Sequence, residues 1–333
     1  MDFRIESTRG QLVESVHRVS VAVVDSEGRL LARSGNPELV SFWRSAAKPF
    51  QAMPLVRDGA ADHYGFGPRE IALACASHSS EPVHADLAEQ MLKKVGLTEQ
   101  DLACGPHPPL SASLTDSPPR VSGGLSPRWS NCSGKHAGML ALARHHDWPI
   151  AGYERESHPV QGRCLEAVAD WSGQPRQTIR LAVDGCTTVC HGLPLAAMAV
   201  AYARLGASDD PAARRIRDAM MAHPQLVAGT GRLCTELMAA YPGLIVAKVG
   251  ADGIYSAAFP DNGLGVALKV EDGDMRSARP ALLGVIRQLR ERKLVNLPGS
   301  DWPAAVAHHA ELPTVNTRGT VTGVMRAAGR LHF

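Results

Sequence analysis

A serine and a lysine stand three residues apart in FWRSAAKPFQ, the stretch from residue 42 to residue 51. The spacing from Ser45 to Lys48 is close to one helical turn, so both side chains would share one face of a helix. A serine hydroxyl is a weak nucleophile until a neighbouring base takes its proton, and lysine serves as that base when burial and a second cation lower its pKa. Alone, this spacing is weak evidence for a catalytic pair.

The chain builds most of its positive charge from arginine, since its 35 basic residues include only seven lysines. Four of these lysines lie in apolar or glycine-rich stretches: Lys48, Lys135, Lys248 and Lys269. Arginine stays protonated, whereas lysine can lose its proton when buried, so chemistry that needs a basic amine must use lysine. A chance remainder in an arginine-rich chain is the alternative explanation.

The order of predicted elements strengthens the catalytic interpretation. Residues 16–35 predict a β-hairpin with its turn at 25–28, and a helix is expected from Ser45 to about Asp58. A mainly helical middle follows. After Pro242, LIVAKVG, IYSAAF and LGVALKV predict an antiparallel meander, followed by a helix over 277–293 and a strand in RGTVTGVMRA.

This succession places Ser45 and Lys48 on a helix after two strands, and Lys248-Val249-Gly250 on a later strand. Penicillin-recognising serine hydrolases carry S-x-x-K and K-T-G on the same succession of elements. Lys248 would then supply the second cation or hold a substrate carboxylate. The Ser-x-Asn motif of those enzymes has no counterpart after Ser45, which argues against action on β-lactams.

Three further stretches place cysteine, serine or histidine beside small residues: CASHSSE at 75–81, NCSGKHAGML at 131–140 and VDGCTTVCHG at 183–192. Thiolates and imidazoles from the last two could form a zinc site, although the spacing is not that of a standard zinc finger. Each cysteine could equally be a small buried hydrophobe. The serines of CASHSSE could equally cap a helix or close a turn.

Composition excludes several classes of function. The net charge is +2 and the basic residues are scattered, so neither nucleic acid nor an anionic membrane is an expected partner. The first twenty residues lack the pattern of a secretory leader, and we expect a cytoplasmic protein. Seven cysteines form an odd set in a chain too large to need disulfides, which favours reduced thiols.

A chain of 333 residues exceeds the size of one simple core. The pattern predicts an α/β (α+β) fold, with 1–44 plus 242–333 forming an antiparallel-sheet part and 45–241 a mainly helical part. We expect the active site at the junction of the two parts. The stretch 104–129 is rich in proline, glycine and serine, and its length favours an ordered functional loop or lid.

The motifs together resemble the L-asparaginase II family, the Rhizobium-type asparaginases. They are RSAAKPFQ, CASHSSE, NCSGKHAGML, DGC, HPQLVAGTGR and AKVGADG, and they appear in order over about residues 10–330. The resemblance implies a serine-β-lactamase/transpeptidase-like fold shared with some glutaminases, with an antiparallel sheet flanked by helices and a helical subdomain inserted after the N-terminal hairpin. It also implies hydrolysis of L-asparagine to L-aspartate and ammonia, a homodimer and no organic cofactor.

By the same resemblance, two Ser-Lys tandems lie side by side. Ser45 pairs with Lys48, and the second tandem uses Ser77 of CASHSSE and Lys248 of AKVG. In the expected mechanism Ser45 attacks the side-chain amide with Lys48 as base, while Ser77 and Lys248 relay a proton to the departing ammonia. In the rival assignment Ser77 is the nucleophile with Lys248.

The family's zinc, where present, is bound by two cysteines and a lysine, which correspond to Cys132, Cys186 and Lys135. Lysine is an unusual ligand because it must bind as the neutral amine. The flanking residues are expected to bind the substrate's carboxylate and ammonium groups or to orient the metal ligands; they are Arg44, His136 and Asp184.

One position departs from the family pattern: Cys234 stands where an aspartate is usual, so we expect the charge of that aspartate to be missing. Two other classes of function remain as alternatives. One is a glutaminase or another serine amidohydrolase, including a penicillin-type enzyme. The other is a non-catalytic regulator that binds an amino acid, which would have no need for both Ser-Lys pairs.

Overall fold

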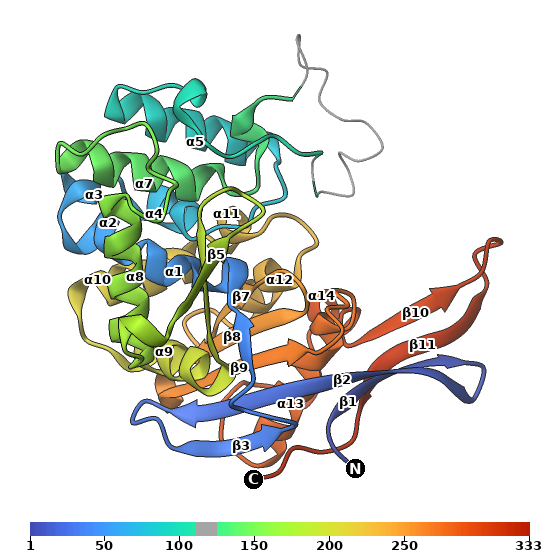
Figure 1. Cartoon of the computed structure of the whole chain (residues 1–333). Helices are drawn as coiled ribbons and strands as arrows, with labels where there is room; N and C mark the ends of the chain where they lie inside the picture. Colours follow the sequence, from blue (N-terminus) through green and yellow to red (C-terminus); the bar gives the residue numbers. More distant parts are fainter. Residues whose placement is uncertain (109, 111–124) are drawn as a thin grey trace. The chain divides into compact units, whose positions relative to one another are not determined.

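A computed structural model gives the fold of the protein (Figure 1) and describes residues 1–108, 110 and 125–333. The chain divides into two compact units. The first comprises Met1–Ala46, Leu193–Ala207 and Glu236–Phe333, and the second comprises Ala47–Gly192 and Ser208–Thr235. We call them the sheet unit and the helical unit. Most of the predicted loop or lid at 104–129 lies outside the described residues.

An antiparallel sheet forms the centre of the sheet unit. Its strands run in the order β10-β11-β1-β2-β9-β8-β7, and β3 pairs with β2. The strands are β1 (Arg4–Arg9), β2 (Leu12–Asp25), β3 (Leu30–Ser34), β7 (Val246–Val249), β8 (Ile254–Phe259), β9 (Leu264–Val270), β10 (Glu311–Val315) and β11 (Val321–Ala328). A short strand, β4 (Val40–Phe42), precedes the 3-10 turn η1 (Arg44–Ala47).

The sequence predictions for this unit are largely confirmed. β2 and β3 form the predicted hairpin, and Asp25 closes its turn by accepting hydrogen bonds from the backbone amides of Glu27 and Arg29. β7, β8 and β9 form the predicted meander. The strands β1 and β10 were not predicted, although each forms a hairpin with the next strand: β1 pairs with β2, and β10 pairs with β11.

Two helices pack on this sheet: α9 (Leu195–Ala207) and α13 (Ala278–Glu291), the latter close to its predicted range. α9 lies so close to β9 that a Cβ added at Gly265 would overlap the backbone oxygen of Ala199. All six residues of β8 are buried, which shows that both faces of the sheet are covered at this strand. The unit also contains α14 (Ala304–Ala307) and η5 (Pro260–Asn262), and α12 (Leu233–Ala240) begins at its boundary.

The helical unit is built from short and medium helices. They are α1 (Lys48–Gln51), α2 (Met53–Arg57), α3 (Ala60–His63), α4 (Pro68–Ala74), α5 (Pro82–Val95), η2 (Glu99–Asp101), η3 (Pro127–Trp129), α7 (Ser133–His145), α8 (Pro159–Ser172), η4 (Arg176–Thr178), α10 (Pro211–Ala222) and α11 (Pro224–Val227). A hairpin of β5 (Arg180–Val183) and β6 (Val189–Pro194) completes it. α7 packs against both α4 and α5.

The predicted helix from Ser45 to about Asp58 is broken into pieces. Ser45 lies in η1, Lys48 begins α1, and a further helix, α2, starts at Met53. Pro49 and Pro54 each stand in the first turn of their helix, where a missing N–H is tolerated. A second proline five residues after the first cannot sit inside one continuous helix, so the chain restarts the helix there. Apart from this break, the predicted α/β class with an antiparallel sheet and a helical insertion is confirmed.

None of the helices in the described parts of the chain is long and apolar enough to cross a membrane.

Asp58, at the end of α2, holds α7 and α8 together within the helical unit. Its carboxylate accepts hydrogen bonds from Arg163 Nε at 3.0 Å and from His146 Nε2 at 3.1 Å. Burial alone would raise the pKa of Asp58, but its hydrogen bonds from Arg163 and His146 keep the pKa below the ordinary value. The carboxylate therefore stabilises the fold in its ionised form.

We expect Asp58→Asn to lower the free energy of unfolding by about 1–3 kcal/mol at pH 7, because Arg163 loses its ionised acceptor. Since the folded pKa is depressed, this stabilisation is complete above the unfolded pKa and disappears as the pH falls through the folded value. Urea unfolding at a series of pH values should show the two proteins converging below about pH 4. Asp62→Asn is the matched control, because its pair with Arg215 is exposed and should contribute less than about 1 kcal/mol. Equal losses from both substitutions would contradict the assignment.

Candidate active site

Lys48 is buried at the start of α1, where its amine makes three hydrogen bonds. It donates to the backbone oxygen of Ala76 at 2.6 Å, to Ser77 Oγ at 2.8 Å and to Cys132 Sγ at 3.0 Å. A buried amine is tolerated only when it is hydrogen-bonded, and these three contacts satisfy it. The arrangement brings together three predicted site residues that are up to 84 positions apart in sequence.

The segment that carries Ser77 follows α4 and is fixed from several sides. The amide of Ser77 donates to the oxygen of Val227 at 3.0 Å, and the amide of His78 donates to the oxygen of Asn131 at 3.2 Å. His78 Nδ1 accepts from the amide of Ser80, which leaves Nε2–H to donate to Ser133 Oγ at 3.0 Å. Burial lowers the pKa of His78 well below its ordinary value, in keeping with a neutral ring. These contacts fix Ser77 relative to α7.

A second lysine–sulfur pair lies in the same unit. Lys135, in the first turn of α7, donates to Cys186 Sγ at 3.0 Å and to Thr188 Oγ1 at 2.5 Å. Cys186 and Thr188 belong to the turn between β5 and β6. Burial would lower the pKa of Lys135, but the charge of Cys186 beside it raises the pKa above the ordinary value. Lys135 and Cys186 are therefore an ammonium–thiolate pair.

Cys132 and Cys186 share a hydrogen bond and ionise unequally. The hydrogen bond from Cys132 and the Lys135 charge depress the pKa of Cys186, whereas donating that bond, together with burial, raises the pKa of Cys132. Cys186 is the thiolate and Cys132 the thiol. We call Lys48, Ser77, Cys132, Lys135 and Cys186 the lysine–sulfur cluster.

The cluster brings together the three predicted zinc ligands: Cys132, Lys135 and Cys186. His136 is buried beside them, donating or accepting at Nδ1 with Tyr153 Oη at 2.6 Å, while its Nε2 has no hydrogen-bond partner among the described residues. Burial lowers the pKa of His136 to about 4, so the ring is a neutral nitrogen donor. Two sulfurs, an amine and an orphaned imidazole nitrogen form a donor set that suits zinc.

The other predicted catalytic residues belong to the sheet unit. Ser45 lies in η1, which is anchored by Trp43 and by a hydrogen bond from Tyr202 Oη to the oxygen of Ala46 at 2.9 Å. Trp43 Nε1 donates to Ser256 Oγ at 3.1 Å. Ser256 stands opposite Lys248 in the β7–β8 ladder, and Lys248 is fully buried. This lysine donates to the oxygen of Val249 at 3.0 Å.

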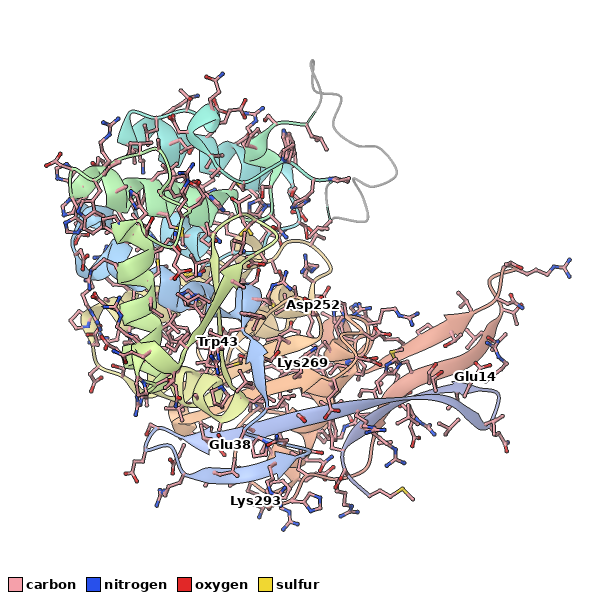
Figure 2. All side chains as sticks on the ribbon, viewed as in Figure 1. Glu14, Glu38, Trp43, Asp252, Lys269 and Lys293 are labelled. Atoms are coloured by element: carbon pink, nitrogen blue, oxygen red, sulfur yellow. The ribbon has the colours of Figure 1, made fainter. Side chains whose placement is uncertain are left out.

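Arg44 takes a left-handed backbone conformation, with φ of 53°, and pairs with Asp252 in the turn between β7 and β8. Figure 2 labels Trp43 and Asp252 in this part of the sheet unit. A side chain at Gly250 would meet the oxygen of Trp43 at 2.9 Å, so this glycine permits the close approach of the two segments. The AKVGADG motif therefore supports the turn that carries Ser45.

The remaining predicted residues have local contacts. Asp184 is half-buried at the start of the β5–β6 turn and accepts a hydrogen bond from the amide of Gly185 at 2.7 Å. Cys234 is buried in α12. Sequence reasoning missed Thr188 and Tyr153, which contact Lys135 and His136. Thr188 follows Cys186 by two positions in VDGCTTVCHG, which is the signal that could have identified it; Tyr153 has no comparable motif.

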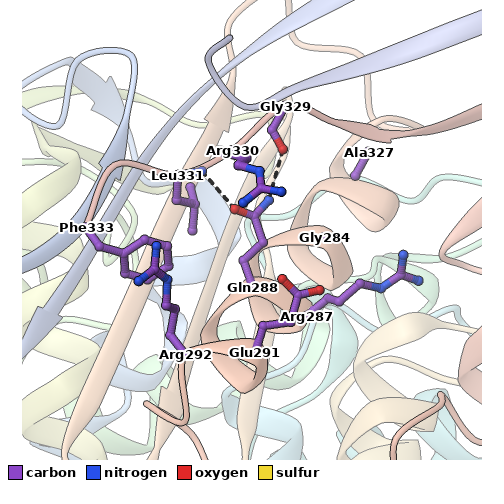
Figure 3. Close-up of a pocket in the computed structure, with 10 residues that line it drawn as sticks. All are labelled: Gly284, Arg287, Gln288, Glu291, Arg292, Ala327, Gly329, Arg330, Leu331 and Phe333. Atoms are coloured by element: carbon purple, nitrogen blue, oxygen red, sulfur yellow. Dashed lines mark hydrogen bonds between the residues drawn. The ribbon is translucent and has the colours of Figure 1, made fainter.

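A separate surface cavity of about 250 Å³ lies in the sheet unit between α13 and the C-terminal segment (Figure 3). Gln288 crosses it, donating to the oxygen of Gly329 and accepting from the amide of Leu331, and Arg292 lies over the ring of Phe333 at 4.7 Å. None of the predicted site residues lines this cavity. The chemistry of the lysine–sulfur cluster, rather than this cavity, defines the candidate active site.

The hydroxyl of Ser77 is buried and contacts the amine of Lys48. A lysine amine in such a contact can activate a serine hydroxyl for nucleophilic attack. The model of one protein family, L-asparaginase II, matches residues 5–327. The chain belongs to the L-asparaginase II family. This membership supports an amidohydrolase-type function. A search of curated proteins finds no match to the chain.

Among solved structures, the chain is similar to one described as a crystal structure analysis of Mglu, with a TM-score of 0.50 and 16% identity over 85% of this chain and 69% of that one. A second structure, of Mglu in its tris and glutamate form, has a TM-score of 0.48 and 16% identity, covering 89% of this chain and 64% of that one. The chain thus spans about two thirds of Mglu. A β-lactamase from Mycobacterium bovis has a TM-score of 0.31 and 13% identity, covering 77% of this chain and 88% of that one. At 16% identity, the similarity to Mglu shows a similar fold and nothing about the reaction.

The lysine–sulfur cluster depends on the close packing of α7 on α4. Gly134 stands between Cys132 and Lys135, and a Cβ added there would overlap the backbone oxygen of Leu73. Backbone cannot give way as a flexible side chain can. We expect Gly134→Ala to lower the free energy of unfolding by about 1–3 kcal/mol and to displace the start of α7.

The matched control is Gly162→Ala in α8, where an added Cβ meets nothing within 4 Å. Alanine there should raise stability by about 0.4–1 kcal/mol, because it restricts the unfolded chain and suits a helix. Urea unfolding of both variants measures the contrast. If Gly134→Ala were as stable as Gly162→Ala, α7 would not be held against α4 as described.

Proposed function

We propose that the protein is an L-asparaginase, which hydrolyses the side-chain amide of L-asparagine to L-aspartate and ammonia. The observation that carries this proposal is the buried contact between Lys48 Nζ and Ser77 Oγ at 2.8 Å, in a chain of the L-asparaginase II family. A lysine that touches a serine hydroxyl in a site removed from water can exchange a proton with it. Both groups were predicted as catalytic from their motifs.

The proposed reaction is acyl transfer in two steps. The hydroxyl of Ser45 attacks the amide carbon, and its proton passes to Lys48, three residues along the chain. The carbon–nitrogen bond then breaks, and Ser77 with Lys248 relays the proton from Lys48 to the nitrogen, which leaves as ammonia. Water attacks the resulting ester: its oxygen bonds to the carbonyl carbon, the bond to Ser45 Oγ breaks, and a proton of the water restores the Ser45 hydroxyl as L-aspartate is released.

The two lysines have different roles in the proposed reaction. Lys135 is the ammonium paired with the Cys186 thiolate. Lys48 must be the neutral amine when it takes the proton of Ser45, because an ammonium can only donate. Arg44, His136 and Asp184 are proposed to bind the substrate's carboxylate and ammonium groups.

We also propose that Cys132, Cys186 and Lys135 hold a zinc ion, with His136 Nε2 as the nearest further nitrogen donor. The orphaned Nε2 and the two sulfurs support this proposal. A zinc ion bound there supplies a positive charge close to the Lys48 amine. Lys135 must first give up its proton, because only the neutral amine can bind a metal.

The rival assignment makes Ser77 the nucleophile. One observation favours it: the described partner of Lys48 is Ser77, and the other two N–H groups of Lys48 point to Ala76 and Cys132. In this version Ser77 acts as the nucleophile with Lys248, and the Ser45–Lys48 tandem assists. The net chemistry is unchanged.

Three further expectations belong with this proposal: a homodimer, a cytoplasmic location, and a preference for asparagine over glutamine. A glutaminase would share the reaction and differ only in its substrate. A regulator that binds asparagine without turnover would retain the amino acid and release no ammonia. Assays on both amides distinguish these functions.

We expect the purified protein to release ammonia from L-asparagine faster than from L-glutamine. Ser45→Ala and Lys48→Met should each lower kcat/KM by at least about a thousandfold, because each removes one member of the acyl-transfer device. Lys93→Met is the matched control, since Lys93 is an exposed lysine paired with Glu89 on α5. Circular dichroism checks that each variant folds. Full turnover by Ser45→Ala would exclude Ser45 as the nucleophile, and no release from either amide by folded, zinc-replete protein would contradict the function.

A trapping experiment assigns the nucleophile. Quenching the enzyme with acid during turnover should preserve an acylated peptide, which mass spectrometry identifies by its added mass. We expect the modification at Ser45, within the peptide that contains SAAK. Acylation at Ser77 would reverse the roles of the two serines, and Ser77→Ala should then abolish the adduct.

A further inference from the structure

Two consecutive histidines and a glutamate converge in the sheet unit, away from every motif used above. Glu236 lies on α12, and His308 and His309 follow α14. His309 Nε2 is 2.6 Å from Glu236 Oε2, and His308 Nε2 is 3.5 Å from the same oxygen. One donor atom from each side chain lies within 4.8 Å of the other two. We call these three residues the Glu–His cluster.

We propose that the Glu–His cluster binds a divalent first-row transition-metal ion. Two imidazoles and one carboxylate form the facial triad that proteins use for iron, zinc, cobalt or nickel, with further positions open to water. Donor atoms around one such ion are separated by about 3 Å, given metal–ligand bonds of about 2.1 Å. The distances of 2.6 and 3.5 Å are close to this value, so small side-chain movements would admit the ion.

The surroundings allow both retention and entry. His309 is fully buried, Glu236 is mostly buried with 20% of its side chain exposed, and His308 is 55% exposed. A metal ion could enter past His308, and the buried pair would hold it.

Arg279 opposes metal binding through its hydrogen bond to His309. Arg279 Nη1 lies 3.3 Å from His309 Nδ1, and because a guanidinium can only donate, Nδ1 is the acceptor in this contact. The proton of the neutral ring is then on Nε2, where it is donated to Glu236. Metal binding at Nε2 requires that proton to move to Nδ1, so Arg279 must turn away. A residue that accepts from Nδ1–H would favour the metal, as outer hydrogen-bond partners of histidine ligands do.

The alternative is that the Glu–His cluster binds no metal and is only a hydrogen-bonded contact between α12 and the segment before β10. Cobalt titration distinguishes the two, because thiolate ligands give cobalt a charge-transfer absorption that nitrogen and oxygen ligands do not. The experiment uses the full chain, stripped with a chelator and then titrated with Co²⁺. We expect one bound equivalent without the thiolate signature, and this equivalent should persist when Cys132 and Cys186 are both replaced by serine.

Glu236→Gln and His308→Asn should each weaken this equivalent by at least about tenfold, whereas Arg279→Gln should tighten it by about tenfold, because glutamine can accept from Nδ1–H. His332→Asn is the matched control, since His332 forms a single exposed pair with Asp2 in the same unit. Glu236→Gln is nearly isosteric and His308 is exposed, so both variants should fold.

Cobalt binding that is unchanged in the Glu236→Gln and His308→Asn variants would overturn the proposal, as would the absence of any equivalent lacking the thiolate signature. Asparagine hydrolysis by these variants should match that of the unmodified protein, so the outcome does not depend on the proposed function.

Discussion

The burial of one lysine amine constrains the helical unit. Lys48 is removed from water, and its amine contacts two separate segments: Ala76 and Ser77 after α4, and Cys132 before α7. A buried polar group without hydrogen-bond partners is costly, so these segments must converge around the amine. The same convergence places a serine hydroxyl, a lysine amine and a sulfur within contact distance. Stability and chemistry thus depend on one set of hydrogen bonds.

The second lysine has its counter-ion inside the cluster. Lys135 donates to Cys186 Sγ and to Thr188 Oγ1. The hydrogen bond from Cys132 and the charge of Lys135 depress the pKa of Cys186, whereas donating that bond and burial raise the pKa of Cys132. The charge of Lys135 is therefore balanced by Cys186, and the β5–β6 turn that carries Cys186 and Thr188 is held against the start of α7.

Local signals account for what the sequence could predict. The β2–β3 turn contains Asp25 and Gly28, and the meander has ADG and PDNG turns, so these elements follow from neighbours in the chain. The break between α1 and α2 was not predicted. Pro49 fits the first turn of a helix that starts near Ser45, and it is Pro54, five residues later, that makes the helix restart. Spacing and the order of predicted elements pointed to Ser45, Lys48 and Lys248, and the resemblance to a family supplied the other candidate site residues. The contact of Lys48 with Cys132, 84 residues away, depends on the packing of α7 against α4 at Gly134, which no local pattern reveals. Thr188 was missed although it stands two residues after Cys186 in the same motif.

The chain also separates two kinds of donor atoms between its two units. In the helical unit the donors are sulfur and amine, and a metal bound there would have to displace a proton from the Lys135 ammonium, which is paired with Cys186. In the sheet unit the donors are imidazole and carboxylate, and the competitor is the proton that His309 shares with Glu236. Soft thiolates favour zinc and copper(I), whereas imidazole and carboxylate accept a broader range that includes iron, cobalt and nickel. In each set a proton therefore occupies the place that a metal would take. A metal in the helical unit would require Lys135 to lose its proton, and a metal in the sheet unit would require Arg279 to move away from His309.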